Sequence, residues 1–137
     1  MRRLGFLWVA LVLGLSACGD SRVAYPLEIV LDDPYSEYAD IDVTYTVWDV
    51  DGYVVSEGVL ADRLPIYHGE VVRLERAFYA EPGDVIEVDT TFSVDGYVRY
   101  ARGLTTDVRP RDGVFELRVT YSDRLADWVV SFLPFDY

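Results

Sequence analysis

The residues of this chain best suited to chemistry are the carboxylates of a short acidic stretch. Four of them, Asp32, Asp33, Glu37 and Asp40, fall within nine positions. Calcium takes about six to eight oxygen ligands from carboxylates and carbonyls, and a loop between strands can supply several of them. The spacing therefore predicts a calcium site at these residues, with an ordinary solvated acidic loop as the competing interpretation.

Further carboxylates would join this site only if several loops gather at one end of the molecule. The candidates are Asp49, Asp51, Asp95 and Asp112. The run from Asp49 to Gly52 resembles a fragment of an EF-hand loop, but Val47 and Tyr53 interrupt the ligand spacing that such a loop needs. A simple hairpin turn is the better interpretation of that fragment.

A catalytic site does not follow from the remaining polar residues. His68 is the only histidine, and no serine stands in a Gly-x-Ser-x-Gly turn, so no nucleophile and base can be paired from spacing. One histidine and one cysteine, Cys18, are too few for an ordinary structural zinc site. We expect a non-catalytic protein without a required cofactor, and His68 as an exposed loop residue.

Aromatic residues provide a second functional lead. They make up 15% of the sequence, and Tyr and Trp are enriched both in sandwich cores and at protein interfaces. Tyr35 and Tyr38 lie within the acidic stretch, whereas Phe135 and Tyr137 close an unusually apolar C-terminus. These four side chains are predicted to contact a partner; packing of the C-terminus onto its own domain is the alternative.

The N-terminus has the layout of an export signal. Met1 is followed by Arg2 and Arg3, then by an apolar block over residues 4–15 and small residues that end at Cys18. The block has 12 residues, fewer than the roughly 20 that cross a bilayer, and it ends in a small-residue cleavage site. The pattern predicts a signal peptide rather than a membrane-spanning helix.

The tetrapeptide Leu15-Ser16-Ala17-Cys18 resembles the lipobox of bacterial lipoproteins. The resemblance implies cleavage just before Cys18, a diacylglyceryl group on its sulfur, and often an acyl chain on its amino group. Several acyl chains together hold a protein durably on a membrane. We therefore expect a lipid-anchored protein of the cell envelope, with a plain secreted protein cut near Ala17 as the alternative.

The charge excludes one class of partner. The sequence has 24 acidic and 12 basic residues, and processing at Cys18 would remove two arginines, which leaves a net charge of −14. Such a surface opposes binding of the domain itself to the phosphates of nucleic acid or to an anionic membrane face. It favours cations, basic partners or simple solubility.

Hydrophobic residues alternate with polar ones almost throughout the remaining chain, as in strands with one buried face. The clearest case runs over residues 86–94. The segment 71–79 also fits a helical spacing, but its Val, Phe and Tyr content favours a strand. Eight strands are predicted, over residues 25–31, 41–47, 53–60, 71–79, 86–94, 97–104, 115–121 and 128–133.

Turn signals separate these segments. Asp51-Gly52 and Asp95-Gly96 each stand between two predicted strands and suit a two-residue type I′ turn, in which both residues have positive φ. Pro82-Gly83 predicts a third turn. Short strands at this spacing indicate an all-β, antiparallel sandwich of seven to eight strands.

The strand-turn-strand run over residues 47–55 and the turn at 82–84 resemble immunoglobulin-like and transthyretin-like sandwiches, such as the carboxypeptidase regulatory-like modules. The resemblance implies a scaffold and no particular activity. The expected organisation is a signal peptide over 1–17, a lipidated cysteine and tether over 18–24, and a sandwich over 25–137. We expect a binding or assembly module with an envelope protein as partner; calcium or carbohydrate binding through residues 32–40 is the alternative, and an envelope hydrolase is disfavoured.

Overall fold

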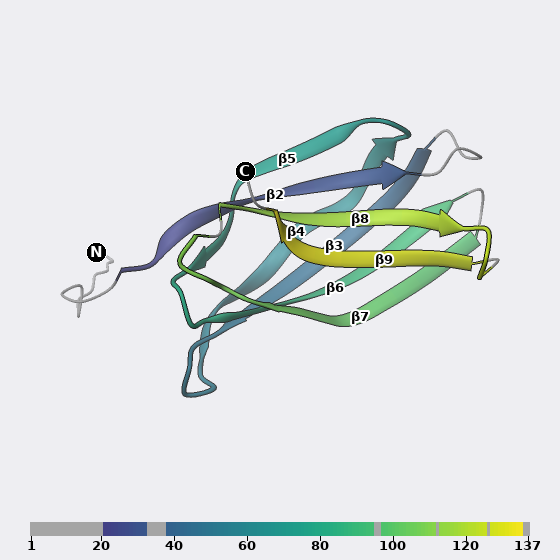
Figure 1. Cartoon of the computed structure of the whole chain (residues 1–137). Coiled ribbons are helices and arrows are strands. Elements are labelled where there is room, and N and C mark those ends of the chain that lie inside the picture. The colour runs from purple at the N-terminus through teal and green to yellow at the C-terminus, as the bar shows by residue number, and fades with distance from the viewer. Residues whose placement is uncertain (1–20, 33–37, 95–96, 112, 126, 136–137) are drawn as a thin grey trace.

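Eight β-strands make up most of the computed structural model, which describes residues 21–32, 38–94, 97–111, 113–125 and 127–135 (Figure 1). No helix in this described part of the chain is long and apolar enough to cross a membrane. All eight predicted strands are confirmed, including the ambiguous segment 71–79. Their bounds are β2 Val23–Asp32, β3 Tyr38–Trp48, β4 Val54–Tyr67, β5 Val71–Ala80, β6 Val85–Val94, β7 Tyr97–Asp107, β8 Val114–Ser122 and β9 Asp127–Phe135.

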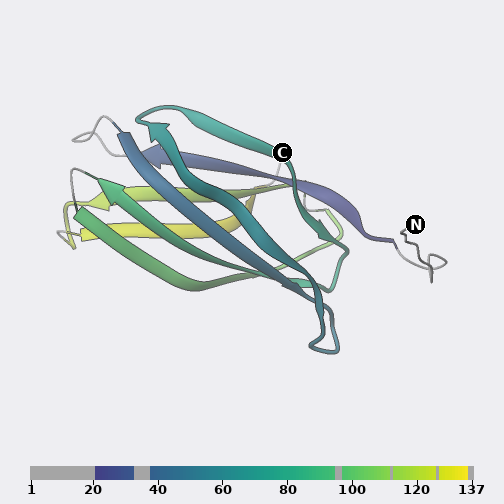
Figure 2. The same ribbon diagram turned by 180° about the vertical axis from the view of Figure 1, so that it is seen from behind.

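The strands form two four-stranded sheets that pack face to face, as Figures 1 and 2 show from opposite sides. One sheet has the order β5-β2-β8-β9 and the other the order β4-β3-β6-β7. The all-β sandwich is therefore as predicted. One neighbouring pair departs from the antiparallel expectation, because β2 and β8 run parallel, with Leu27 opposite Phe115.

The parallel pair follows from where the chain changes sheets. The amide of Val108 donates to the carbonyl of Asp84 at 2.8 Å, so β7 ends beside the start of β6. The chain then crosses to the other sheet, and β8 begins at the same end of the sandwich as β2. Alternation along a single strand carries no information about this choice of neighbour.

The core fills the space between the sheets with side chains from alternate positions. Phe78 lies at its centre, with its ring in edge contact with those of Tyr45, Phe115 and Phe132 at centroid separations of 5.6 to 5.8 Å. Edge-to-face pairs of this kind add to the stabilisation from burial alone. In β6, inward and outward positions alternate without exception, as the sequence predicts.

The connection between β3 and β4 corrects the predicted turn type. Gly52 has a φ of +85°, but Asp51 does not adopt a positive φ. The amide of Gly52 donates to the carbonyl of Asp49 at 3.0 Å, and the amide of Asp49 to the carbonyl of Tyr53 at 2.8 Å. The connection is a three-residue loop with an ordinary turn followed by a left-handed glycine. The second Asp-Gly pair, at 95–96, lies outside the described residues.

The side chain of Asp49 explains this geometry. Its Oδ1 accepts hydrogen bonds from the amides of Asp51 and Tyr53, both at 2.9 Å. An aspartate that binds the amide two residues ahead favours an ordinary turn conformation at the residue between. The predicted turn at Pro82-Gly83 is present, with the amide of Asp84 donating to the carbonyl of Glu81 and a φ of +99° at Gly83.

The two ends of the sandwich are formed by different connections. The N-terminal end, on the left of Figure 1, comprises residues 21–23, 49–53, 81–84 and 108–111. The far end comprises residues 68–70 and 123–125 together with the first residues of β3 and β7. Strand β2 begins at Val23, two residues before the expected start of the domain, and four residues separate it from Cys18.

Candidate binding face

The outer face of the β4-β3-β6-β7 sheet carries a group of polar and exposed aromatic side chains, and it is the candidate binding face. Strand β6 turns its alternate residues Asp89, Thr91 and Ser93 to this face, because Val88, Thr90 and Phe92 point into the core. The register places Asp42 of β3 opposite Thr91 and Tyr100 of β7 on its other side. Side chains from β3, β6 and β7 therefore meet on one surface.

Asp42 supports an irregularity in the edge strand β4. The pairing of β3 with β4 shifts around Val43, and Arg63, opposite this region, has a left-handed φ of 51°. The Oδ1 atom of Asp42 accepts a hydrogen bond from the amide of Arg63 at 2.7 Å. A non-glycine residue in this conformation is strained and persists where neighbouring groups hold it. The carboxylate of Asp42 supplies that support.

Asp89 holds a similar irregularity in the other edge strand, β7. The pairing of β6 with β7 shifts between Val88 and Thr90, and Gly103 has a φ of +68°. The Oδ1 atom of Asp89 accepts a hydrogen bond from the amide of Gly103 at 2.7 Å. Two inner strands thus each use one aspartate to hold a bulge in the adjoining edge strand. Such bulges bend a sheet and discourage edge-to-edge pairing with another chain.

A shallow hollow of about 200 Å³ lies between the two bulges. It is lined by Asp42, Thr44, Asp89, Thr90, Thr91 and Arg102. The hydroxyl of Thr90 donates to the carbonyl of Asp42 at 2.9 Å, so this buried polar group is satisfied. In the described part of the chain, neither aspartate of the hollow nor Arg102 takes part in an ion pair. The hollow therefore offers carboxylates, hydroxyls and a guanidinium to a ligand.

Exposed tyrosines border the hollow toward the far end. The ring of Tyr100 is 66% exposed, and the guanidinium of Arg102 lies 5.6 Å from its centroid. Tyr38 and Tyr67 face each other across β3 and β4 with ring centroids 5.8 Å apart, and both are about half exposed. Val98, on the same face as Tyr100, is also exposed. Aromatic rings at this level of exposure are available to a partner.

The predicted partner-binding residues are described only in part. Tyr38 is exposed and belongs to this face, and its contact with a partner stays a prediction. Tyr35, Tyr137 and the side chain of Phe135, the last residue of β9, lie outside the described part of the chain. Sequence reasoning missed Tyr67 and Tyr100, which it assigned neither to a contact surface nor to the core.

A usable signal for Tyr100 was present in the sequence. The Asp95-Gly96 pair predicts a two-residue turn, which would pair Val94 with Tyr97, and counting back along both strands places Tyr100 opposite Thr91, as the register shows. Thr91 is an outward position of the clearest alternating strand, so Tyr100 had to face outward too. Tyr67 had no such signal, because β4 continues seven residues beyond the predicted end at Leu60.

The predicted calcium site is only partly described. Asp33 and Glu37 lie outside the described residues, Asp40 is exposed on β3, and Asp32 accepts a hydrogen bond from Arg118 at 3.0 Å. The described residues contain no group of three or more side chains able to hold a metal ion. Calcium binding by these four carboxylates stays a prediction.

The suggestion that Asp49 and Asp51 could add ligands to this calcium site is wrong. These residues follow the end of β3, whereas Asp40 stands near its beginning, and a strand of nine residues spans about 30 Å. Asp49 and Asp51 therefore lie at the opposite end of the sandwich from Asp40. Asp95 and Asp112 lie outside the described residues.

His68 lies exposed in the turn between β4 and β5, as expected for a loop residue. The residues before it do not form a loop, because β4 extends through Ile66, which is buried. This strand is longer than predicted since the bulge at Arg63 lets it pass Asp62 and Arg63 without breaking its pairing with β3.

On the outer face of the other sheet, arginines and acidic side chains form ion pairs with one another. Arg118 contacts Glu116 and Asp32, and Arg73 contacts Glu28 and Glu75. The hydrogen bond to Glu116, followed by the charges of Glu116 and Asp32, raises the pKa of Arg118 against the opposing effect of burial. The charged side chains of this face therefore pair with one another. Those of the hollow form no ion pair within the described part of the chain.

Comparison with known proteins gave no relative of this chain: no protein-family model matches it, and a search of curated proteins gave no match.

Proposed function

We propose that this chain is a lipid-anchored, non-catalytic binding protein of the cell envelope. Its anchor is the lipid on Cys18 that the lipobox-like run Leu15-Ser16-Ala17-Cys18 implies. Its binding surface is the outer face of the β4-β3-β6-β7 sheet, and its ligand is another envelope protein. Confinement to a membrane raises the effective concentration of such a module toward any partner on the same surface.

The observation that carries this proposal is the group of exposed tyrosines beside the hollow. Tyr38, Tyr67 and Tyr100 expose between 48% and 66% of their surface on one face of one sheet. Tyr and Arg are enriched where proteins bind one another, because they combine a large apolar area with hydrogen-bonding groups. Arg102 adds a cation that no carboxylate within the described ranges pairs with.

The experiment is capture of partners by mild crosslinking of the tagged, lipidated protein in its native envelope, followed by mass spectrometry. We expect a reproducible partner that is lost with Cys18→Ser, which removes the anchor, and with Tyr38→Ala combined with Tyr100→Ala. The matched control is Leu133→Ala, since Leu133 is 61% exposed on the other sheet. Equal recovery from the tyrosine variant and this control would contradict the assigned face.

A second candidate function is carbohydrate binding at the hollow. The hollow combines two carboxylates, threonine hydroxyls and Arg102, and a sugar ring can stack on the adjacent Tyr100 while its hydroxyls bond to these groups. Titration calorimetry of the mature domain with envelope polysaccharides tests it. Binding that disappears with Arg102→Ala would favour this candidate; absence of heat with every polysaccharide would eliminate it.

A further inference from the structure

We propose that the N-terminal end of the sandwich rests on the membrane, with Val50 and Tyr53 of the β3–β4 loop in the headgroup region of the bilayer. This inference rests on the proposed lipid at Cys18 and adds to it a defined contact surface and orientation. The partner is a phospholipid bilayer surface.

The chain between the anchor and the sandwich is short. Three residue steps separate Cys18 from Ser21, and a fully extended chain covers about 3.6 Å per step, so the Cα atoms of these two residues are at most about 11 Å apart. Acyl chains on Cys18 would hold that residue at the edge of the hydrocarbon region. Ser21 must then lie within or next to the headgroup layer.

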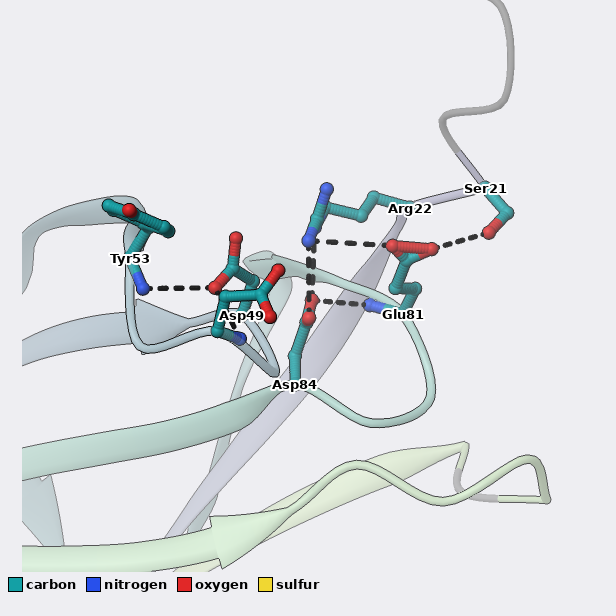
Figure 3. A network of polar contacts seen from close by, with 7 residues as sticks. Ser21, Arg22, Asp49, Tyr53, Glu81 and Asp84 are labelled. Atoms are coloured by element: carbon teal, nitrogen blue, oxygen red, sulfur yellow. Dashed lines mark hydrogen bonds and ion pairs between the residues drawn. The ribbon is translucent and has the colours of Figure 1, made fainter.

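Ser21 and Arg22 are bound to the sandwich by hydrogen bonds and ion pairs (Figure 3). The hydroxyl of Ser21 donates to Glu81 Oε1 at 2.6 Å. The guanidinium of Arg22 donates to both carboxylate oxygens of Asp84, at 3.0 and 3.2 Å, and lies 3.4 Å from Glu81. We call this group of four residues the tether clamp. It fixes the β5–β6 turn within the same short distance of the membrane.

The tip of the β3–β4 loop lies beside the tether clamp. A Cβ atom placed on Gly83 would approach Val50 Cγ1 to 3.1 Å, so the tip of the β3–β4 loop sits directly against the β5–β6 turn. Val50 is 75% exposed and Tyr53 72%, the two most exposed large apolar side chains among the described residues. Figures 1 and 2 show this loop projecting beyond the strands around it. A short tether therefore brings the most exposed apolar tip to the bilayer.

The chemistry of the tip fits the headgroup region. Tyrosine is enriched at membrane interfaces, where its ring and hydroxyl meet apolar and aqueous surroundings at once. The carboxylate of Asp49 is occupied by the amides of Asp51 and Tyr53, which reduces the cost of bringing it near lipid. Acidic residues outnumber basic ones in the domain, so the contact should depend on apolar burial and the anchor rather than on anionic lipid.

The experiment places a fluorescent probe at the tip of the lipidated protein. Val50→Cys, labelled with an environment-sensitive dye, is reconstituted in vesicles of phosphatidylcholine and phosphatidylglycerol that contain lipids with headgroup nitroxides. The lipidated Cys18 is blocked and does not take the dye. We expect strong quenching and a blue-shifted emission at position 50. The matched control is Leu125→Cys, exposed in a turn at the far end, which should show neither.

A second variant separates orientation from anchoring. An insertion of about ten Gly and Ser residues between Asp20 and Ser21 adds a flexible reach of about 17 Å and leaves the fold untouched. We expect this variant to stay on the vesicles and to lose most of the quenching at position 50.

Three results would overturn the inference. Position 50 quenched no more than position 125, on vesicles that retain the protein, would refute the contact while the anchor stands. Undiminished quenching after the insertion would show that the tether does not orient the domain. Mass spectrometry that finds no lipid on Cys18 would refute the proposed anchor and this inference together.

Discussion

The replacement Arg22→Ala is the sharpest test of how the tether is attached. The guanidinium of Arg22 pairs with the carboxylate of Asp84 at 3.0 Å, and Asp84 is 1% exposed. Removing the guanidinium leaves a buried charge that still accepts a hydrogen bond from the amide of Glu81 at 2.9 Å. The variant should therefore destabilise the whole domain, although Arg22 lies before the first strand.

The size of the expected loss of stability follows from how deeply Arg22 and Asp84 are buried. Breaking a buried ion pair by removing one partner costs about 3–5 kcal/mol. The side chain of Arg22 is 19% exposed, and the amide of Glu81 still stabilises the carboxylate of Asp84, so we expect a smaller loss than this range, about 2–3 kcal/mol. For a domain of this size, about 1 kcal/mol shifts the melting temperature by about 4 °C. The expected loss is about 8–12 °C.

The assay is thermal and urea unfolding of the mature chain with Cys18→Ser, followed by circular dichroism. Arg111→Ala serves as the control, because Arg111 is exposed and should change stability by less than about 0.5 kcal/mol. Combining Arg22→Ala with Asp84→Asn should cost less than the two single changes together, since both remove the same interaction. A loss for Arg22→Ala no larger than that for Arg111→Ala would refute the role assigned to the buried pair.

Three further predictions concern the rest of the fold. Arg118→Gln should cost about 1 kcal/mol or less because the side chain of Arg118 is 37% exposed and solvent screens its ion pairs; the raised pKa of Arg118 keeps the stability from its charge present until strongly alkaline pH, so urea unfolding should give equal losses in mildly acidic and mildly alkaline buffer. Gly83→Ala should cost about 2 kcal/mol and Gly52→Ala about 1 kcal/mol, because both have positive φ but only the former meets Val50; equal melting temperatures would contradict this. Phe78→Ala should cost about 3–5 kcal/mol by urea unfolding, since its ring is fully buried, and a smaller loss would show that the core relaxes into the cavity.

Local pattern predicted the elements well for a physical reason. Side chains in a strand alternate between two faces, so burial of one face makes hydrophobic and polar residues alternate along the sequence. That rule located β6 closely, whereas β5, with its helix-like spacing, was identified as a strand from its Val, Phe and Tyr content. It failed at the end of β4, because the bulge at Arg63 interrupts the period while the backbone pairing continues.

The candidate site was far less predictable. Asp42 and Asp89 stand about a third of the chain apart, and each looked like one of many outward carboxylates in an acidic sequence. Their common role, holding a bulge in the adjoining edge strand, depends on which strands become neighbours. The predicted site at residues 32–40 drew instead on proximity in the sequence, which says nothing about side chains that come from other strands.

Local sequence patterns were enough to show that this protein is built of β-strands and roughly where each one runs, and its composition makes it strongly acidic. These properties are local or compositional, so they need no knowledge of the partner of any strand. The folded arrangement is needed to see that β2 and β8 run parallel, that Arg22 binds Asp84 across 62 positions, and that tyrosines border a polar hollow. Each of these depends on the pairing and packing of distant segments, which the burial of a common core selects and which no local pattern encodes.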